Sequence, residues 1–155
     1  MDRFDHVLWV GDLNFRVNKS RAEVDQLLTG PNALRHVKSL LEADELRKAM
    51  ESDNNKSLQL TPVLVLIFFE GKIFEGFEEG DIGFLPTFKF DINSDAYDTS
   101  EKQRVPSYTD RILYRSKKKE DVKCLAYDSI SHVRCSDHRP VYAVFTVSLK
   151  PGRDK

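Results

Sequence analysis

A short polar cluster with chemical potential follows the run Trp9-Val10-Gly11 and contains Asp12 and Asn14. A carboxylate and an amide two residues apart, just past the end of a strand, can point into one pocket. There Asp12 can accept a proton or hold a metal-bound water, and Asn14 can donate to an oxyanion. Glycine, aspartate and asparagine are also common turn residues, so this cluster alone is equally compatible with a simple strand-to-loop turn.

A second cluster spans residues 104–113, where Pro106 and Ser107 indicate a turn and the pair Asp110-Arg111 opens an apolar stretch. An exposed Asp–Arg neighbour pair is ordinarily a surface ion pair that contributes under about 1 kcal/mol. Taken alone, this cluster therefore favours a structural role.

The third cluster, residues 136–141, places Asp137 beside His138 immediately before an alternating apolar run. An aspartate next to a histidine can orient the imidazole and stabilise its cation, which makes a phosphate-binding or proton-transferring group. His132 has no such neighbour and is predicted to be an ordinary surface histidine. Taken together, the three clusters at strand ends are typical of metal-assisted phosphoester hydrolysis.

The elements that must position these clusters can be outlined from the sequence. Residues 6–10 indicate a buried strand, and Ser20 with Glu23 forms a capping box for a helix that ends near Gly30. Helical patterns cover residues 34–41 and 44–50. Strands are predicted at 112–114, 122–127 and 141–149, the last from apolar residues at every odd position. Helices between strands predict one mixed α and β domain.

Composition sets broad limits on the class of protein. The chain has 155 residues and a net charge of -1, which does not favour a nucleic-acid partner. Two cysteines, Cys124 and Cys135, are too few for a disulfide framework, so we expect an intracellular protein. The apolar run 63–69 is too short to span a bilayer as a helix.

The three motifs together resemble the signatures of the inositol polyphosphate 5-phosphatase family. Residues 9–16 match its Trp-x-Gly-Asp-x-Asn-aromatic-Arg motif, and residues 106–113 match its Pro-x-aromatic-Thr-Asp-Arg-Ile-Leu motif. Residues 136–141 match an element shared with the wider DNase I-like superfamily. Tyr108, residues 89–91 and the tail 150–154 are most similar to the 72 kDa phosphoinositide 5-phosphatase branch.

The resemblance implies the C-terminal portion of a catalytic domain, with residues 1–155 forming part of a four-layer DNase I-like α/β sandwich with two central sheets and outer helices. It implies Mg²⁺-dependent hydrolysis of the 5-phosphate of phosphoinositides or inositol polyphosphates. The expected setting is a peripheral membrane surface on the cytoplasmic face, without a nucleic-acid partner. An insertion is expected at about residues 52–69, where residues 63–69 form an aggregation-prone window or an extra core strand.

The resemblance also implies roles for individual residues. Asp12 is expected to activate or orient water, Asn14 to stabilise the transition state, and Asp110 to lie in the metal and nucleophile region. His138, oriented by Asp137, is expected to contact the scissile phosphate. The residues implied to bind substrate phosphates or to order the loop beside them are Lys89, Lys102, Arg104 and Arg111.

Three features qualify the resemblance. Phe88 stands where the family usually has Tyr, which removes one hydroxyl contact to a substrate phosphate. Arg139 is expected to tolerate substitution. The family's main metal ligand, a Glu, is expected upstream of residue 9, so no metal ligand is assigned within this chain and the isolated chain is expected to be inactive.

Two alternatives stay open. One is a DNase-like or abasic-site endonuclease, because Asp12, Asn14 and the residues 136–138 are shared with such enzymes. The motif at residues 106–113 and the lack of a strongly basic stripe argue against it. The other is a non-catalytic fragment or splice product that folds poorly and binds partners.

Overall fold

The computed structural model describes residues 3–51 and 74–149, so the predicted insertion at about 52–69 lies outside the described residues. The elements are, in chain order, β1 (His6–Asp12), α1 (Arg21–Leu28), the 3-10 helix η1 (Ala33–His36), α2 (Val37–Leu41), α3 (Glu45–Glu51), β2 (Glu78–Glu79), β3 (Asp110–Ser116), the 3-10 helix η3 (Lys119–Asp121), β4 (Val122–Ser129) and β5 (Val141–Val147). This order confirms the predicted mixed α and β class, whereas the four-layer arrangement stays a prediction.

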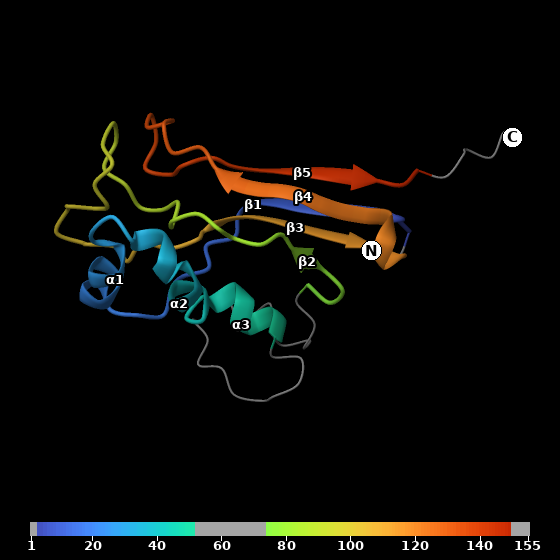
Figure 1. Ribbon diagram of the computed structural model, residues 1–155, viewed down its shortest axis with the longest axis horizontal. Coiled ribbons are helices and arrows are strands. Elements are labelled where there is room, and N and C mark those ends of the chain that lie inside the picture. The colour runs from blue at the N-terminus through green and yellow to red at the C-terminus, as the bar shows by residue number, and fades with distance from the viewer. Residues whose placement is uncertain (1–2, 52–73, 150–155) are drawn as a thin grey trace, which may run out of the picture.

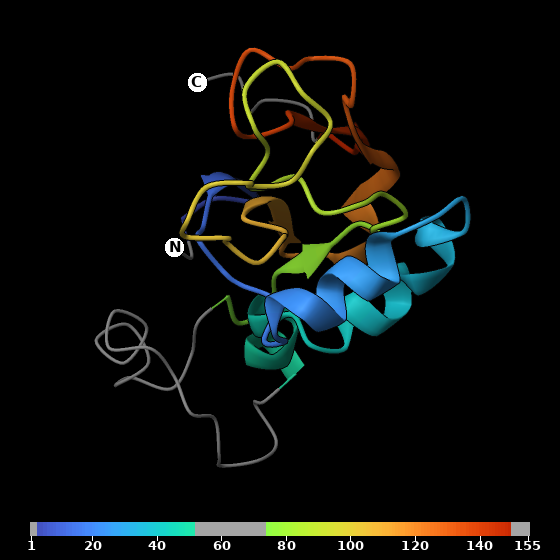
Figure 2. The same cartoon turned by 90° about the vertical axis from the view of Figure 1, so that its left-hand side faces the viewer.

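Two antiparallel sheets make up the β structure. One has the strand order β1-β3-β2, and the other is the pair β4-β5. β1 pairs with β3 over its whole length, which places Asp12 at the end of β1 opposite Asp110 at the start of β3. Tyr114 packs edge-on against Phe145 and joins the sheets, with 5.1 Å between ring centroids. Figures 1 and 2 show β4-β5 on one side of β1-β3 and the three α-helices on the other.

α1 begins at the capping box that the sequence predicts. The backbone N–H of Glu23 donates to the Ser20 hydroxyl at 3.3 Å, and the backbone N–H of Ser20 donates to the Glu23 carboxylate at 2.8 Å. These reciprocal bonds satisfy donors that a helix start leaves unpaired. Val24 faces inward and is fully buried. The helix ends just before Gly30, whose φ of 93° is a turn conformation that favours glycine.

The other two predicted helices form as well. The pattern at residues 34–41 begins as the 3-10 helix η1 and continues as α2. α3 starts after Asp44, whose carboxylate accepts the backbone N–H of Arg47 at 3.0 Å, as an N-cap does. Leu40, Leu46 and Val37 from these helices are buried.

The core has two parts, which meet the sheet from the helical side. The larger cluster joins the helices to the loops that precede β3, and consists of Val17, Val24, Val37, Leu40, Leu41, Ala43, Phe84, Tyr108 and Tyr127. The smaller cluster consists of Phe15, Leu46, Phe77 and Leu113. The segments 12–17 and 108–113 that carry the polar motifs contribute side chains to both clusters. Packing therefore fixes the backbone of the motifs.

Residues 6–10 form a strand, as predicted, but the prediction that this strand is buried is wrong. β1 is an edge strand among the described residues, and Leu8 and Val10 are 54% and 61% exposed. In β5 the odd positions are half-buried as predicted up to Phe145, but Val147 and Leu149 are exposed. Alternation identifies the apolar face of a strand and does not say what covers that face.

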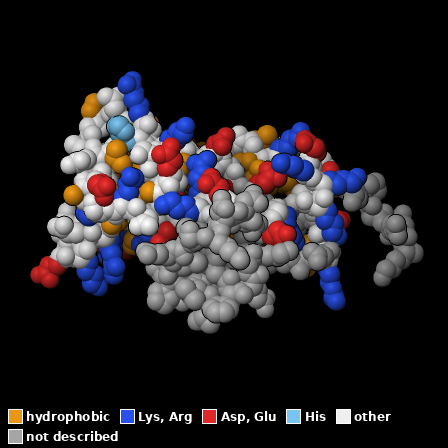
Figure 3. Space-filling model, turned by 90° about the horizontal axis from the view of Figure 1, so that it is seen from below, with side chains coloured by type: hydrophobic (Ala, Val, Ile, Leu, Met, Phe, Trp, Pro, Cys, Tyr) orange, Lys and Arg blue, Asp and Glu red, His pale blue; other side chains and the backbone are white. Residues whose placement is uncertain are grey.

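Figure 3 shows basic and acidic side chains interspersed over the face it presents, without a single basic stripe. Within the described ranges, no helix has the length and apolar character needed to cross a bilayer.

Candidate active site

The first motif begins at the end of β1. Gly11 has a φ of 140° and Asn14 a φ of 59°, conformations that glycine and asparagine adopt more readily than other residues. The backbone N–H of Asn14 donates to Asp12 Oδ1 at 2.9 Å, and the backbone N–H of Leu13 donates to the carbonyl of Thr109 at 2.8 Å. Directly opposed residues in an antiparallel pair have Cβ atoms about 4.5–5.5 Å apart, so Asp12 and Asp110 face the same site.

His138 is brought to this site by the loop between β4 and β5. Its Nδ1 lies 2.7 Å from Asp110 Oδ2, and the Thr109 hydroxyl donates to the same carboxylate oxygen at 2.9 Å. Because an ionised carboxylate can only accept, Nδ1 carries the proton in this pair. Nε2 is then the atom available to a substrate, and no other described residue contacts it.

The expectation that Asp137 orients His138 is wrong. Asp110 makes that contact, whereas the Asp137 carboxylate accepts only the Ser136 hydroxyl, at 3.4 Å. The Asp137 backbone carbonyl accepts the N–H of Phe90 at 2.9 Å. This bond connects the loop between β4 and β5, called the histidine loop below, to residues 88–90. Asp110 and His138 lie 28 positions apart, and nothing in the spacing of the sequence marks them as a pair.

Phe88 forms one wall of the site. Its ring centroid lies 4.7 Å from that of the His138 imidazole, and the guanidinium of Arg16 lies 4.4 Å from its centroid on the ring face. A cation over an aromatic face is attracted by the ring's electron density. Sequence reasoning missed Arg16 as a site residue, although it closes the first motif. Its pKa is lowered by burial and by the nearby charge of Arg104, while Asp12 opposes this effect.

Two of the basic residues expected to bind substrate phosphates are near this wall, because Lys89 follows Phe88 directly and the charge of Arg104 acts on Arg16. Lys89 is half-buried, whereas Lys102 and Arg104 are exposed. Asp98 connects two of them, because its backbone N–H donates to the Lys89 carbonyl and its carboxylate accepts the Arg104 backbone N–H, both at 2.8 Å. Hydrogen bonds from Ser100 and from Arg104, with the charge of Lys89, lower the pKa of Asp98 to about 2.

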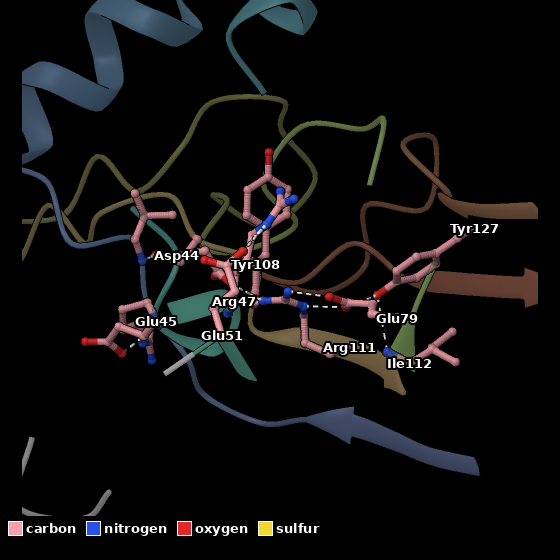
Figure 4. Close-up of polar contacts among 12 residues, drawn as sticks. Asp44, Glu45, Arg47, Glu51, Glu79, Tyr108, Arg111, Ile112 and Tyr127 are labelled. Carbon is pink, nitrogen blue, oxygen red and sulfur yellow. Dashed lines mark hydrogen bonds and ion pairs between the residues drawn. The ribbon is translucent and has the colours of Figure 1, made fainter. Parts of the chain in front are cut away.

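Arg111 cannot belong to the substrate-binding set. Its side chain is 1% exposed, and it is held between Asp44 and Glu79 (Figure 4). Nε and Nη2 donate to the Glu79 carboxylate at 2.7 and 2.6 Å, and Nη1 donates to both oxygens of Asp44 at 2.9 and 3.0 Å. Burial alone lowers the pKa of Arg111, but the two carboxylates outweigh it and raise the pKa above its ordinary value. The residue locks the start of β3, as expected of a loop-ordering role.

Arg139 is also more constrained than the sequence analysis predicts. It is 3% exposed, and its guanidinium lies 3.9 Å from the ring centroid of Phe90. It donates to the carbonyl oxygens of Ser136 and Ser94. These contacts join the histidine loop to the loop of residues 91–98, so Arg139 supports the site and tolerance to its substitution is not expected.

The described residues do not by themselves form a site for the divalent cation that the resemblance implies. Mg²⁺ requires near-octahedral oxygen coordination, usually from one or two carboxylates with water and phosphate. Asp110 is already engaged by His138 and Thr109. In residues 3–51 and 74–149, no three His, Cys, Asp or Glu side chains are grouped closely enough to hold an ion. No catalytic step is therefore assigned to a metal.

The geometry can be compared with known proteins. A family model described as Endonuclease/Exonuclease/phosphatase family 2 matches residues 1–64 and 57–144 of the chain. The chain belongs to this family. Phosphatidylinositol polyphosphate 5-phosphatase type IV of Homo sapiens is 45% identical over 152 residues, which are 98% of this chain and 21% of that protein. Synaptojanin of Caenorhabditis elegans is 43% identical over an alignment of 157 positions, which covers 100% of this chain and 12% of that protein.

Solved structures support the same placement. The inositol polyphosphate 5-phosphatase domain of spsynaptojanin, in complex with inositol (1,4)-bisphosphate and calcium, is 37% identical with a TM-score of 0.70. The match covers 94% of this chain and 37% of that one. A Cimex nitrophorin in its ferrous NO complex is 32% identical with a TM-score of 0.73, covering 96% of this chain and 44% of that one. The chain thus spans 21% and 12% of these two curated relatives and less than half of the solved domains.

Proposed function

We propose that this chain forms part of a phosphatase that hydrolyses the 5-phosphate of phosphoinositides or inositol polyphosphates, with Mg²⁺ as its cofactor. The observation that carries the proposal is the Asp110–His138 pair, at 2.7 Å, beside Asp12 and Asn14 at one end of the β1-β3 pair. The relatives named as 5-phosphatases and the inositol bisphosphate bound to the spsynaptojanin domain support the class of substrate. The calcium in that structure supports a divalent cation.

The described residues suit a phosphoryl transfer to water. Asp12 accepts a proton from the attacking water, whose oxygen forms the new bond to phosphorus. As the bond from phosphorus to the ring oxygen breaks, that oxygen keeps the bonding electron pair and takes a proton from solvent water. Negative charge spreads over the phosphoryl oxygens, to which the Asn14 amide can donate a hydrogen bond, as can His138 Nε2 when the imidazole carries both protons. Fixed donors of this kind cost no reorganisation during the reaction. Mg²⁺, when bound, supplies further charge stabilisation.

The proposed location is a peripheral membrane surface on the cytoplasmic side, where phosphoinositide headgroups are exposed. The pair of cysteines, Cys124 and Cys135, is free in the structure, and this is consistent with a reducing compartment. Lys89, Lys102 and Arg104 supply the positive charge that a multiply phosphorylated ring needs.

Lys89 should set substrate preference rather than turnover. A charge-assisted hydrogen bond contributes about 1.5–3 kcal/mol, so Lys89→Ala should weaken substrates that carry a 4-phosphate at least about tenfold more than substrates that lack it. The measurement is kcat/KM on both substrate types, in a form of the protein that spans the whole domain of its solved relatives, called the full-domain protein below. Lys123→Ala, an exposed lysine on β4, is the matched control. Equal losses on both substrates would contradict this role.

Two alternatives can be separated by assay. An abasic-site endonuclease would share Asp12, Asn14 and His138, and a binding role is the second alternative, since a similar fold occurs in a nitrophorin in a ferrous NO complex. The full-domain protein should be tested for phosphate release from phosphatidylinositol 4,5-bisphosphate and for nicking of DNA that contains an abasic site. We expect Mg²⁺-dependent phosphate release without nicking. Nicking without phosphate release would establish the endonuclease, and neither activity in a folded protein would establish a binding role.

Residues 1–155 on their own should release little phosphate even with Mg²⁺ present. The described residues do not gather three ligands for an ion, and Leu8 and Val10 of β1 expose an apolar face that favours association. A misplacement of about 1 Å in a catalytic group can cost a hundredfold in rate. The assay is phosphate release from phosphatidylinositol 4,5-bisphosphate with and without Mg²⁺. Turnover within about tenfold of the full-domain protein would refute this expectation.

A further inference from the structure

Arg16 occupies an unusual place in the site, because it contacts another site residue rather than open solvent. Its Nη2 donates to the side-chain oxygen of Asn14. A guanidinium has only donors, so the Asn14 atom that faces it must be Oδ1 and not the amide nitrogen. The amide N–H₂ of Asn14 is consequently turned away from Arg16, and no described residue accepts from it.

Both the side chain and the backbone of Arg16 have defined partners. The Phe88 ring lies under the guanidinium at 4.4 Å, and the same ring packs against His138. The backbone of Arg16 is bound to α3, where its N–H donates to the Glu45 carboxylate and its carbonyl accepts the Glu45 N–H, both at 2.9 Å. The Phe88 ring therefore orients the guanidinium, and the backbone bonds fix the point from which the side chain extends.

We propose that Arg16 is a positioning residue, which holds Asn14 so that its amide N–H₂ faces the phosphoryl oxygens of the substrate. The backbone of Asn14 is already set by its bond to Asp12 at 2.9 Å, which leaves rotation of the amide plane as the freedom that needs control. Without Arg16, the amide can present either its oxygen or its nitrogen, and an oxygen facing a phosphoryl oxygen repels it. This role rests on the proposed function, since it assumes that Asn14 donates to the transition state.

The proposal predicts a particular kinetic pattern in the full-domain protein. Arg16→Ala should lower kcat at least about tenfold with KM changed less than about twofold, because the lost interaction acts in the transition state. In an Asn14→Ala background the same substitution should cost less than about threefold more, because residues that act as a unit are not additive. Arg16→Lys should restore little, since an ammonium lacks the planar fork that both stacks on Phe88 and reaches Asn14.

The rival role for Arg16 is direct binding of a substrate phosphate, and it gives the opposite pattern. A raised KM with unchanged kcat, additive losses in the double variant, or recovery by Arg16→Lys would each overturn the positioning role. Arg47→Ala is the matched control, because Arg47 lies on α3 with a half-exposed side chain that pairs only with Glu51, and it should leave both constants unchanged.

A second measurement does not depend on activity. In ¹⁵N spectra of the full-domain protein, Arg16→Ala should move the Asn14 side-chain amide signals toward their unstructured position, whereas Arg47→Ala should leave them in place. Unchanged signals in Arg16→Ala would overturn the proposal. If the full-domain protein hydrolyses no 5-phosphate, the proposed function fails, and the spectra still decide whether Arg16 holds Asn14.

Discussion

Replacing His138 with alanine should lower the kcat of the full-domain protein at least about a hundredfold, while KM changes less than about threefold. The imidazole is held by Asp110 at 2.7 Å and by the Phe88 ring, so its Nε2 is presented to a substrate in one orientation. Asp12→Ala and Asn14→Ala should lower kcat on the same scale, because removing one fixed donor or base costs about 10²–10³.

Asp110→Asn gives the sharper test of the pair. An asparagine keeps the shape but lacks the ionised oxygen that accepts from Nδ1, so the imidazole loses the contact that fixes its orientation. We therefore expect Asp110→Asn to lower kcat by at least about tenfold.

Asp137→Asn is the matched control for Asp110→Asn, since its carboxylate accepts only from Ser136 at 3.4 Å. Its effect should be less than about threefold. A near-normal kcat in His138→Ala or Asp12→Ala would contradict the assignment of the site. A larger loss in Asp137→Asn than in Asp110→Asn would contradict the pairing that the structure shows.

The parts of the site that could be predicted from sequence are those with a local cause. Asp12 and Asn14 follow a strand and a glycine, and the capping box of α1 needs only residues three positions apart. The same local logic located β5, where alternation of side chains distinguishes its two faces. Packing then places these segments relative to one another. Side-chain alternation along the chain does not identify the neighbouring strand or the element that covers each face of a sheet.

Two of the contacts that escaped prediction join distant positions. Asp110 meets His138 across 28 positions, and Arg111 meets Asp44 across 67. Successive side chains in a strand point in opposite directions, so Arg111, next to Asp110 in β3, turns away from the catalytic site and into the core. Only the pairing of β1 with β3 decides which of the two faces the substrate.

Removing the carboxylate of Asp44 should destabilise the region around β3 by about 3 kcal/mol, the lower end of the cost of removing one partner from a buried ion pair, because Glu79 stays bound to Arg111. Arg111 is 1% exposed and Asp44 0%, so water cannot replace the lost contact (Figure 4). Asp44 also caps α3 through the N–H of Arg47, which adds about 1 kcal/mol to the loss. Asp44→Ala thus disturbs two elements that both support the site.

Hydrogen exchange of the β3 amides in the full-domain protein measures this effect locally, because exchange reports the free energy of opening. In Asp44→Ala we expect those amides to exchange at least about a hundredfold faster, since each 1.4 kcal/mol is a factor of ten. Asp44→Asn should fall between Asp44→Ala and the wild type, because the amide still caps α3 but lacks the charge. Glu51→Ala removes the exposed pair with Arg47 and should change exchange less than about fivefold. A similar change in Asp44→Ala and Glu51→Ala would show that the buried guanidinium is stabilised by packing and Glu79 alone, and that Asp44 does not hold the start of β3.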